Sequence, residues 1–325
     1  MFNKKIIITG ATGFIGSHLT ELFVNKGYNV TAFDRYNTTY DLGNLKNSKF
    51  KNDINFIFGD IRDYDSVSKA CKGMDIILHL AALVGIPYSY YSPLAYIKTN
   101  FEGTYNILEV AKQSNVEQLI VTSTSETYGS AQKIPMNENH RLIGQSPYSA
   151  SKISADQLSI SYWRSYKLPV KIIRPFNTFG PRQSSRAVIP SIITQALNNK
   201  TIKLGNINTS RDFTYVTDVC DAYYEMLKIK NLFGEPVNVG SNKEYKIRDI
   251  AKKIIKKVNP KIKIKIEKKR IRPLQSEVDR LRCDNKLIIK KSKWRPKISF
   301  EEGLKKTIHW IKSKDFSEPS DIYRI

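Results

Sequence analysis

A tyrosine and a lysine four residues apart are the first side chains in this sequence whose types and spacing suit acid–base chemistry. Tyr148 and Lys152 share a face if their segment is helical, and an ammonium beside a phenol favours the phenolate. Tyr224 and Lys228 have the same spacing, which an amphipathic surface helix explains. The first pair differs because it follows Pro147 and is surrounded by small residues that leave space for a ligand. The pattern therefore predicts a general base at Tyr148, supported by Lys152.

Two hydroxyls and a carboxylate precede this pair in the chain. Thr124, Ser125 and Glu126 directly follow an apolar, strand-like run. The carboxyl ends of strands form the ligand crevice of an open α/β sheet, so we expect these side chains to face the same ligand as Tyr148. The alternative is that Glu126 is a solvated loop carboxylate.

A glycine-rich turn lies between the first strand-like run and the first helical stretch. Its spacing is GxxGxxG rather than GxGxxG. Glycines there permit a tight turn, let the backbone approach a pyrophosphate and allow a helix to pack closely, while the helix N-terminus favours the phosphate charge. The alternative is a glycine turn without a ligand. We expect the following residues to bind a dinucleotide: Gly10, Gly13, Phe14, Ile15 and Gly16.

Two aspartates follow the next strand-like runs. Asp34 stands 18 residues after Gly16, where a carboxylate would hydrogen-bond an adenosine ribose and repel a 2′-phosphate. This predicts NAD rather than NADP, although the neighbouring Arg35 weighs against that choice. Asp60 and Ile61 follow the third run and are predicted to lie near the adenine, with an ordinary turn aspartate as the equal alternative.

The elements that must position these residues alternate between apolar runs and amphipathic stretches through residue 180. This is the pattern of a parallel sheet with helices on both faces. We expect strands at 5–9, 29–33, 54–58, 75–80, 118–123 and 170–175, and helices at 17–26, 66–71, 101–114 and 149–166. The rhythm changes after Pro181, where we expect helices at 187–198 and 216–227 and strands at 202–204 and 237–240.

The composition bounds the class of protein. The chain has 325 residues, 41% of them hydrophobic, which is enough for a substantial core and excludes general disorder. No apolar run approaches the roughly 18–20 residues that span a bilayer, and the first strand begins too early for a signal peptide. The cysteines are too few and too scattered for a disulfide framework or a metal site: Cys71, Cys220 and Cys283. We therefore expect a cytoplasmic protein with no metal and no membrane partner.

The net charge of +23 is concentrated in one segment. Residues 243–314 contain 26 basic and 8 acidic residues, a net +18, and within them residues 261–266 alternate between lysine and isoleucine. Alternation with period two predicts a half-buried strand with its lysines in water. An electrostatic funnel for an anionic substrate is the second interpretation, and a module for anionic polymers is a third. We expect no nucleic-acid partner, because no aromatic–basic interleaving or recognition-helix pattern accompanies the charge.

Together with Leu80, Ala81, Ala82 and Asn100, these motifs resemble the extended short-chain dehydrogenase/reductase family, and within it the nucleotide-sugar epimerases and dehydratases. The similarity runs from Lys4 to about Arg295. It implies a Rossmann-like doubly wound parallel sheet with a smaller C-terminal α/β domain, and NAD as the cofactor. It also implies that Leu80–Ala82 contact the cofactor, that Lys152 anchors the nicotinamide ribose, and that Asn100 kinks a helix or holds water.

The same resemblance implies a nucleotide-diphosphate sugar as substrate. The matching segments lie at residues 174–182, 210–213 and 272–273, and relatives use them to hold the diphosphate and the nucleoside. Arginines can grip phosphates through two parallel hydrogen bonds. Ordinary surface ion pairing is the alternative for each arginine. The substrate-binding residues carried over are Tyr88, Asn177, Arg186, Arg211 and Arg272.

Glu126 narrows the resemblance further. Relatives that only epimerise C4 usually have a small uncharged residue there, whereas 4,6-dehydratases have Glu. Thr124-Ser125-Glu126 is similar to the form found in GDP-mannose 4,6-dehydratases, and the segments 85–90 and 144–148 look closest to the GDP-N-acetylglucosamine dehydratases of legionaminic acid synthesis. We therefore expect a lyase that forms a 4-keto-6-deoxy sugar. A 4-epimerase and a UDP-glucuronate decarboxylase, which also carries Thr-Ser-Glu, remain alternatives.

The resemblance also predicts domain organisation and assembly. We expect residues 1–180, with about 213–240, to bind NAD, and residues 181–212 and 241–325 to bind the nucleotide sugar. Relatives pair through the helices that begin near Phe101 and Ser149, which predicts a homodimer or a higher homo-oligomer. A regulator that senses the dinucleotide without chemistry is a further alternative, but it would have no use for Thr124, Glu126 or Tyr148.

Overall fold

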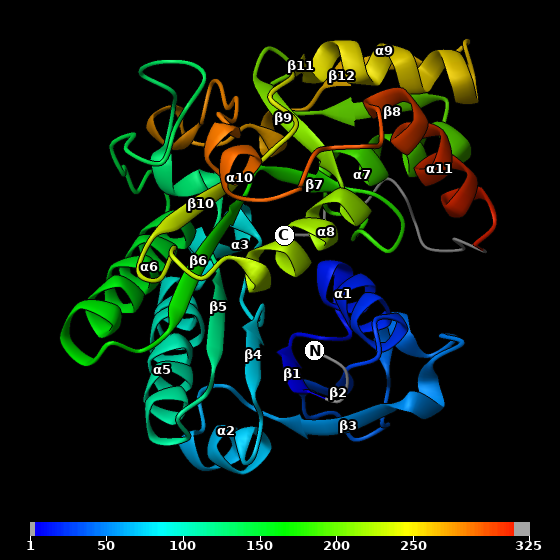
Figure 1. Cartoon of the computed structure of the whole chain (residues 1–325). Helices are drawn as coiled ribbons and strands as arrows, with labels where there is room; N and C mark the ends of the chain where they lie inside the picture. The colour runs from blue at the N-terminus through cyan, green and yellow to red at the C-terminus, as the bar shows by residue number, and fades with distance from the viewer. Residues whose placement is uncertain (1–3, 315–325) are drawn as a thin grey trace.

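The computed structural model describes residues 4–314, and its largest element is a seven-stranded sheet. Every neighbouring pair in this sheet is parallel, and the spatial order is β10-β6-β5-β4-β1-β2-β3 (Figure 1). The chain leaves β1 toward β2 and β3 on one side and toward β4, β5 and β6 on the other. A crevice opens where the strand order reverses in such a sheet, at the carboxyl ends of the strands. The strands are β1 (Lys5–Thr9), β2 (Asn29–Arg35), β3 (Ile54–Gly59), β4 (Ile76–His79), β5 (Gln118–Thr122), β6 (Val170–Pro175) and β10 (Pro236–Val239).

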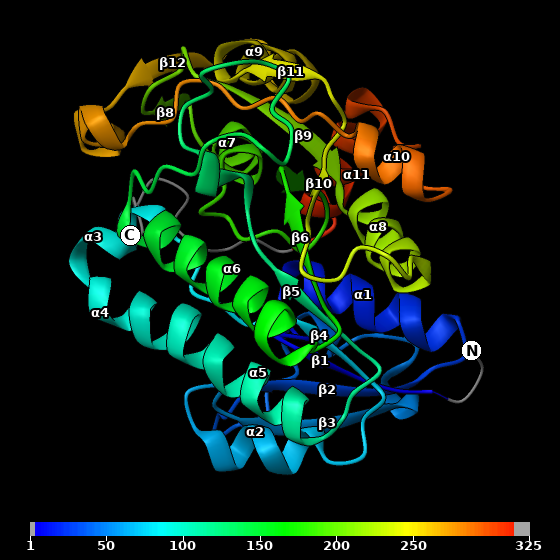
Figure 2. The same ribbon diagram turned by 60° about the vertical axis from the view of Figure 1, so that its left-hand side comes forward.

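Helices cover both faces of this sheet, which explains why its central strands are apolar along nearly their whole length. One face packs against α2 (Tyr64–Cys71), α5 (Gly103–Gln113) and α6 (Pro147–Tyr166). The other packs against α1 (Phe14–Asn25) and α8 (Val216–Lys228). Figure 2 shows α5 and α6 lying side by side across the sheet.

The segment before α5 is irregular. Helices α3 (Ile86–Tyr91) and α4 (Pro93–Tyr96) lead into a π-helical turn, η3 (Ile97–Glu102). Asn100 lies in that turn and is 1% exposed. Its amide accepts a hydrogen bond from the Leu83 backbone N–H and donates to the Leu83 carbonyl and to Ser151 of α6. Asn100 therefore ties the loop after β4 to α6, at the point where the helix departs from α geometry.

Two small sheets and four helices complete the described chain. Strand β9 (Ser210–Tyr215) lies between β7 (Asn177–Phe179), which is parallel to it, and β11 (Glu244–Lys246), which is antiparallel. Strand β12 (Lys263–Ile266) pairs in parallel with β8 (Thr201–Leu204). The helices are α7 (Val188–Asn198), α9 (Ile247–Val258), α10 (Lys286–Lys291) and α11 (Phe300–Lys312). Short 3-10 turns lie at Gly43–Leu45, Lys51–Asp53, Ser125–Tyr128 (η4), Lys268–Arg270 and Leu274–Ser276.

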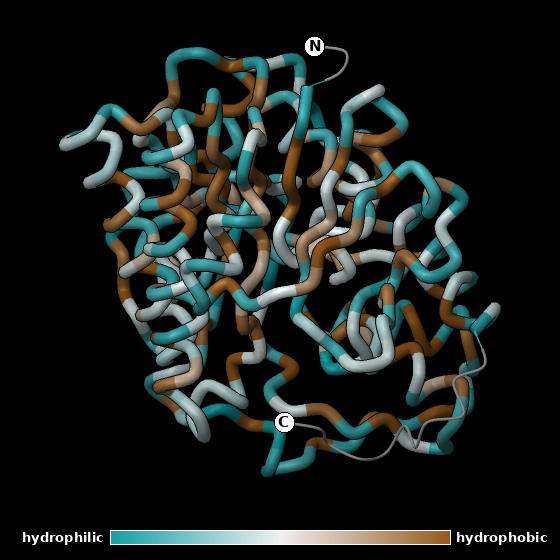
Figure 3. The backbone as a smooth tube through the Cα atoms, turned by 90° about the horizontal axis from the view of Figure 1, so that it is seen from below, coloured by the Kyte–Doolittle hydropathy of each residue, from teal (hydrophilic) through white to brown (hydrophobic). Residues whose placement is uncertain are grey.

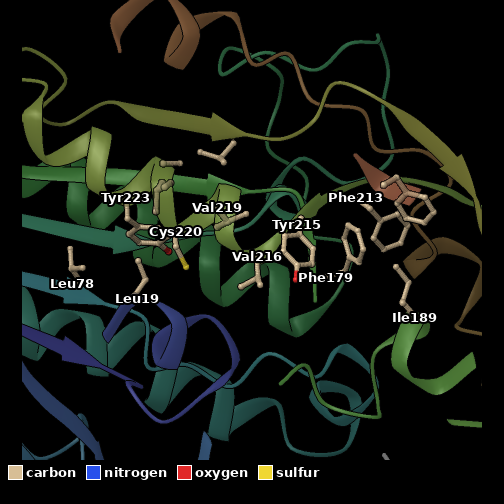
Figure 4. Packing of buried hydrophobic residues seen from close by; sticks show 14 of the residues in the cluster. Leu19, Leu78, Phe179, Ile189, Phe213, Tyr215, Val216, Val219, Cys220 and Tyr223 are labelled. Carbon is tan, nitrogen blue, oxygen red and sulfur yellow. The ribbon is translucent and has the colours of Figure 1, made fainter. Parts of the chain in front are cut away.

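One buried cluster joins the large sheet to the small ones. Helix α8 is the bridge: Figure 4 shows Cys220 and Tyr223 of this helix near Leu19 of α1, and Val216 near the aromatic rings of Tyr215 and Phe179. The same cluster continues to Ile311 near the end of α11. Figure 3 shows the apolar stretches gathered along the strands inside the molecule, with polar chain around them.

The predicted α/β class and doubly wound parallel sheet are confirmed, and the predicted strands of the large sheet coincide with the observed ones to within one or two residues. The predicted division into domains stays a prediction, and residues 1–3 and 315–325 lie outside the described part of the chain. No helix within residues 4–314 is long and apolar enough to cross a membrane. Within the same residues, no cluster of three His, Cys, Asp or Glu side chains could hold a metal ion.

A buried histidine gives this fold a specific pH dependence. His79 at the end of β4 is 1% exposed and hydrogen-bonds Thr9 (2.8 Å) and Thr104 (3.2 Å) through its two ring nitrogens. Burial lowers the pKa of His79 to about 3, against about 6.5 in the unfolded chain. The folded state therefore resists protonation. Its contribution to stability is complete above about pH 6.5 and is lost as the pH falls toward the folded pKa.

We predict that the free energy of unfolding falls between about pH 6.5 and pH 4, and that His79 contributes roughly 1.4 kcal/mol per pH unit to that slope. His79→Gln, which does not titrate, reduces the slope by about that amount even if it lowers stability at neutral pH. Urea unfolding at several pH values measures it. Equal slopes for the two proteins would contradict the assignment of a neutral buried imidazole.

Candidate functional site

A cavity of about 780 Å³ opens at the carboxyl ends of the parallel strands. The ends of β2, β3, β5 and β6 line it, as do the loops that follow β1 and β4. Because all these strands point the same way, residues distant in sequence meet at one edge of the sheet. The cavity is lined by all but four of the predicted site residues, the exceptions being Lys152, Arg186, Arg211 and Arg272.

The glycine turn forms one wall. Gly10 has a φ of +69°, and a Cβ there would lie 2.9 Å from the backbone nitrogen of Ala81. At Gly16 a Cβ would lie 2.0 Å from the carbonyl oxygen of Gly10, so only glycine lets α1 start this close to the turn. Gly13 caps α1 without any side-chain hydrogen bond, which leaves backbone N–H groups of the first turn available for an anion. All five predicted residues of this segment line the cavity: Gly10, Gly13, Phe14, Ile15 and Gly16.

The carboxylate of Asp34 is held against the glycine turn. One of its oxygens accepts hydrogen bonds from the backbone N–H (2.7 Å) and hydroxyl (2.6 Å) of Thr12, and the other accepts from the Arg35 backbone N–H. All three residues line the cavity. Sequence reasoning missed Thr12, although its hydroxyl within the glycine motif was the available signal.

Asp60 forms a two-pronged ion pair with Arg62, which also lines the cavity and which the sequence did not single out. The Arg62 guanidinium holds the pKa of the Asp60 carboxyl below its usual value. Ile61 lines the cavity as predicted, and so do Leu80, Ala81 and Ala82. A glycine turn, a free helix N-terminus and two carboxylates at the strand ends together fit the phosphates and ribose of a dinucleotide.

The predicted catalytic hydroxyls and carboxylate lie just beyond β5. Thr124 caps the 3-10 turn η4, its hydroxyl accepting a hydrogen bond from the Glu126 backbone N–H at 3.2 Å. Ser125 and Glu126 follow within the turn, are 2% and 9% exposed, and line the cavity with Thr124. The turn therefore presents all three side chains without leaving any of them in open solvent.

Helix α6 brings Tyr148 and Lys152 to the same end of β5. Pro147 begins the helix, and Ser146 caps it through a reciprocal pair of hydrogen bonds with Ser149. Tyr148 lines the cavity and is hydrogen-bonded to the side chain of Thr124. Lys152 lies behind the cavity wall, 4% exposed, with its ammonium donating to the Thr122 carbonyl at 2.5 Å.

Burial dominates the electrostatics of this pair. It raises the pKa of the Tyr148 phenol well above its ordinary value, against the opposing hydrogen bond to Thr124, and nearby Glu126 adds to the rise. Burial lowers the pKa of Lys152 to about 8, which the negative charge of Asp156 on α6 partly offsets. Tyr148 is therefore a neutral phenol in the chain by itself, and additional positive charge beside it is needed before it can act as a base.

The predicted substrate residues divide into two groups. Tyr88 and Asn177 line the cavity. Arg186 is exposed, and Arg211 and Arg272 lie beside the cavity, each 3.6 Å from the carboxylate of Glu277. Arg211 is buried, whereas Arg272 is partly exposed. Neither arginine lines the cavity, and Arg211 interacts with the carboxylates of Glu126, Glu277 and Asp279 as well as with Arg272.

Two buried oxygens at the cavity have no hydrogen-bond partner among the residues that the structure describes. They are Oδ1 of Asn177 and Oε1 of Gln183, and both residues line the cavity. Buried polar atoms are nearly always satisfied, so these acceptors point to a ligand that donates hydrogen bonds. Gln183 was missed by sequence reasoning, because nothing in its neighbourhood distinguished it from other loop residues.

Comparison with known proteins agrees with this geometry. A family model described as GDP-mannose 4,6 dehydratase matches residues 7–307. The chain belongs to the GDP-mannose 4,6-dehydratase family. The human dTDP-D-glucose 4,6-dehydratase is 32% identical over 321 residues, covering 96% of this chain and 91% of the human protein. A trifunctional UDP-glucose 4,6-dehydratase, 3,5-epimerase and reductase from Arabidopsis thaliana is 33% identical over 316 residues. That match covers 94% of this chain and 47% of the plant protein, so the chain spans about half of it.

Solved structures of relatives superpose over nearly the whole chain. The dTDP-glucose 4,6-dehydratase of Streptomyces venezuelae, with NAD and TYD bound, has a TM-score of 0.87 and 27% identity, covering 95% of this chain and 97% of that one. The UDP-glucuronic acid 4-epimerase of Bacillus cereus, in complex with UDP-glucuronic acid and NAD, has a TM-score of 0.87 and 30% identity, covering 95% and 99%. The relatives include dehydratases and an epimerase, so the choice between the two reactions rests on the side chains of the site.

The contact between Gly16 and Gly10 gives a direct test of the dinucleotide site. Gly16→Ala forces α1 away from the glycine turn, and overpacking of this kind costs roughly 1–3 kcal/mol of stability. We expect the variant to bind NAD at least about tenfold more weakly in a calorimetric titration, since that loss corresponds to only about 1.4 kcal/mol. Gly73→Ala is the control: its φ is +72° but no atom lies within 4 Å, so it should lose stability without losing affinity. Unchanged NAD binding by Gly16→Ala would place the dinucleotide elsewhere.

Proposed function

We propose that this chain catalyses the NAD-dependent 4,6-dehydration of a nucleotide-activated hexose to a 4-keto-6-deoxy sugar. The observation that carries the proposal is the position of Glu126 and Tyr148, which line one cavity and are joined through Thr124. A phenol suits proton transfer at a sugar hydroxyl, and a carboxylate that lines the same cavity suits a second proton transfer at a neighbouring carbon. Epimerisation at C4 needs only the first of these groups.

The chemistry divides between the two groups. Tyr148 removes the proton of the 4-hydroxyl, with Thr124 hydrogen-bonded to the same oxygen. The glycine turn and Asp34 would hold NAD, which would supply a reversible hydride acceptor for the transfer from C4 to C6. The C4 ketone makes the C5 proton acidic, and Glu126 removes it as a general base. The 6-hydroxyl then leaves as water, taking a proton from Glu126. Once C6 has received the hydride, Glu126 delivers a proton taken up from solvent to C5, and Tyr148 releases the proton of the 4-hydroxyl to solvent.

Ser125 distinguishes this site from dehydratases that have Asp at its position. A serine hydroxyl is too weak an acid to protonate a leaving group unaided, so we assign both the uptake of the C5 proton and its delivery to the leaving oxygen to Glu126. Ser125, 2% exposed at the cavity wall, can relay that proton by donating a hydrogen bond.

We propose a nucleoside diphosphate as the activating group, recognised by Arg211 and Arg272 once it displaces them from Glu277. On this basis residues 1–180, with about 213–240, hold the cofactor, and residues 181–212 and 241–325 hold the nucleotide sugar. The cavity-lining residues that support a cofactor-binding part lie in the loops after β1 to β4. The two arginines that support a nucleotide-sugar-binding part lie in β9 and in the segment after β12. GDP-N-acetylglucosamine is the proposed substrate, on the resemblance of segments 85–90 and 144–148 to legionaminic-pathway enzymes.

We also propose that the chain pairs through α5 and α6. Large apolar side chains are exposed along this surface, on α4, η3, α5 and the end of α6: Leu94, Ile97, Tyr105 and Tyr166. A contiguous exposed apolar surface of this kind marks an interface between subunits.

Glu126→Gln tests the elimination step. The amide keeps the size of the side chain but cannot accept the C5 proton, so we expect dehydration to fall by about 10²–10⁴-fold. Reduced cofactor should still form when the nucleotide sugar is added, and deuterium from heavy water should no longer enter C5. Glu244→Gln, a partly buried carboxylate of β11 outside the cavity, is the control. Normal turnover by Glu126→Gln would remove this residue from the mechanism.

Tyr148→Phe separates oxidation from elimination. Without the phenol the 4-hydroxyl proton has no acceptor, so neither reduced cofactor nor keto product should form.

Mass spectrometry of the products from GDP- and UDP-linked hexoses identifies the reaction of the unaltered protein. Loss of water supports dehydration, loss of carbon dioxide would mean decarboxylation, and an unchanged mass with a new sugar would mean epimerisation.

A further inference from the structure

A fully buried ion pair lies next to the cavity without lining it. Arg174 of β6 is 1% exposed and Asp156 of α6 is 0% exposed, and the guanidinium donates to one oxygen of Asp156 at 2.9 Å. The other oxygen of Asp156 has no hydrogen bond among the described residues. Burying two charges carries a desolvation cost that can exceed their attraction, so stability alone is a weak reason for such a pair.

The pair holds the end of the strand that leads to the catalytic turn. The hydroxyl of Ser123 donates to the same Asp156 oxygen at 2.7 Å, and Ser123 lines the cavity next to Thr124. The backbone N–H of Ser123 donates to the Ile173 carbonyl, one residue before Arg174. The point where the chain leaves β5 is thus fixed to both α6 and β6.

The pair also holds the turn that carries Glu126. Tyr128 ends that turn and is 0% exposed. Its hydroxyl accepts a hydrogen bond from Arg174 at 2.9 Å and donates one to Asn238 of β10 at 2.7 Å. The guanidinium carbon of Arg174 also lies 5.0 Å from the centre of the Tyr128 ring. The Tyr128 hydroxyl therefore both accepts and donates a hydrogen bond inside the core.

Helix α6 brings the third connection. Tyr148, Lys152 and Asp156 recur at every fourth residue, so they lie on one face of the helix. The ion pair therefore links the helix that carries the proposed base to the turn that carries the proposed eliminating acid.

The two halves of the site differ in how firmly they are held. Tyr148 stands in a 20-residue helix packed on the sheet. Glu126 stands in a four-residue 3-10 turn whose own backbone bonds are long, 3.4 Å from Thr127 to Thr124 and 3.3 Å from Gly129 to Glu126. Such a turn depends on further contacts for its position. The buried Thr127 hydroxyl donates to the Thr124 carbonyl at 2.8 Å, the Ile143 N–H donates to the Thr127 carbonyl at 2.9 Å, and the Tyr128 hydroxyl ties the turn to β6 and β10.

We propose that Tyr128, held by the Arg174–Asp156 pair, is a positioning residue that fixes Glu126 against the C5 proton while Tyr148 is positioned independently by α6. This inference rests on the proposed dehydration. It identifies Tyr128 as the residue that controls the rate of the second step, the elimination of water. Loss of the Tyr128 hydroxyl then slows elimination and leaves oxidation at C4 intact. The residue acts through Glu126 and touches no substrate.

Tyr128→Phe is the test, because it keeps the ring in the core and removes only the hydroxyl. We expect kcat for loss of water to fall on the order of 10²-fold, the effect of a misplacement of about 1 Å, at unchanged KM. Reduced cofactor should form at the unaltered rate and accumulate, and the rate of deuterium entry at C5 should fall in proportion to kcat. Asn238→Leu removes the other partner of the hydroxyl and should act in the same direction, which provides the test if Tyr128→Phe does not fold.

Tyr223→Phe is the matched control. Tyr223 is also fully buried and shares a hydrogen bond of 2.7 Å with Thr122 of β5, but it contacts neither Arg174 nor the turn that carries Glu126. Its variant should lose comparable thermal stability and keep kcat. The inference would be overturned if Tyr128→Phe and Tyr223→Phe had equal kcat for loss of water. It would also be overturned if Tyr128→Phe slowed oxidation at C4 as much as elimination. Either result would leave the proposed dehydration standing. If the unaltered protein releases no water from any nucleotide sugar, the proposed function fails instead.

Discussion

The burial of Tyr148 and Lys152 against the end of β5 is the constraint on which the site depends. A phenol and an ammonium taken out of water both lose solvation, and the shifts in their pKa values follow that loss rather than their attraction for one another. The Thr122 carbonyl and the Thr124 side chain offset part of it. The result is a phenol that stays protonated in the chain by itself, so the proposed role of Tyr148 as a base requires positive charge from a ligand in the cavity.

Much of the large sheet could be predicted from the sequence, because its strands are continuous apolar runs that end in glycine, aspartate or hydroxyl residues. The strands of one small sheet, β8 and β12, were also predicted, at 202–204 and 261–266. The strands of the other were not. β7 and β11 are only three residues long and β9 contains arginine and aspartate, and they are strands only because distant segments pair there. Helices α9, α10 and α11 of the lysine-rich region were not predicted, although the apolar residues of α9 recur with helical spacing at Ile247, Ile250, Ala251 and Ile254.

Some residues of the candidate site could likewise be predicted from the sequence and others could not. Residues of the glycine turn and of the segment Thr124–Glu126 could be placed from their position after a strand, because strand ends converge by topology. The shared pairing of Arg211 and Arg272 with Glu277 depends on how the later chain folds back, and no local pattern encodes it. The contact of Asp34 with Thr12 is of the same kind, since 22 residues separate partners that the parallel pairing of β1 and β2 brings together.

The unbroken core that runs through α8 has a consequence for how the chain can be divided. Buried residues of α8 belong to the same cluster as Leu19 of α1 and Phe179 of β7, so a cut on either side of α8 would strip apolar surface from both parts. Neither half then retains a closed interior of its own. The polypeptide should melt as one cooperative body, and limited proteolysis should yield intact protein or small fragments rather than a stable nucleotide-binding half.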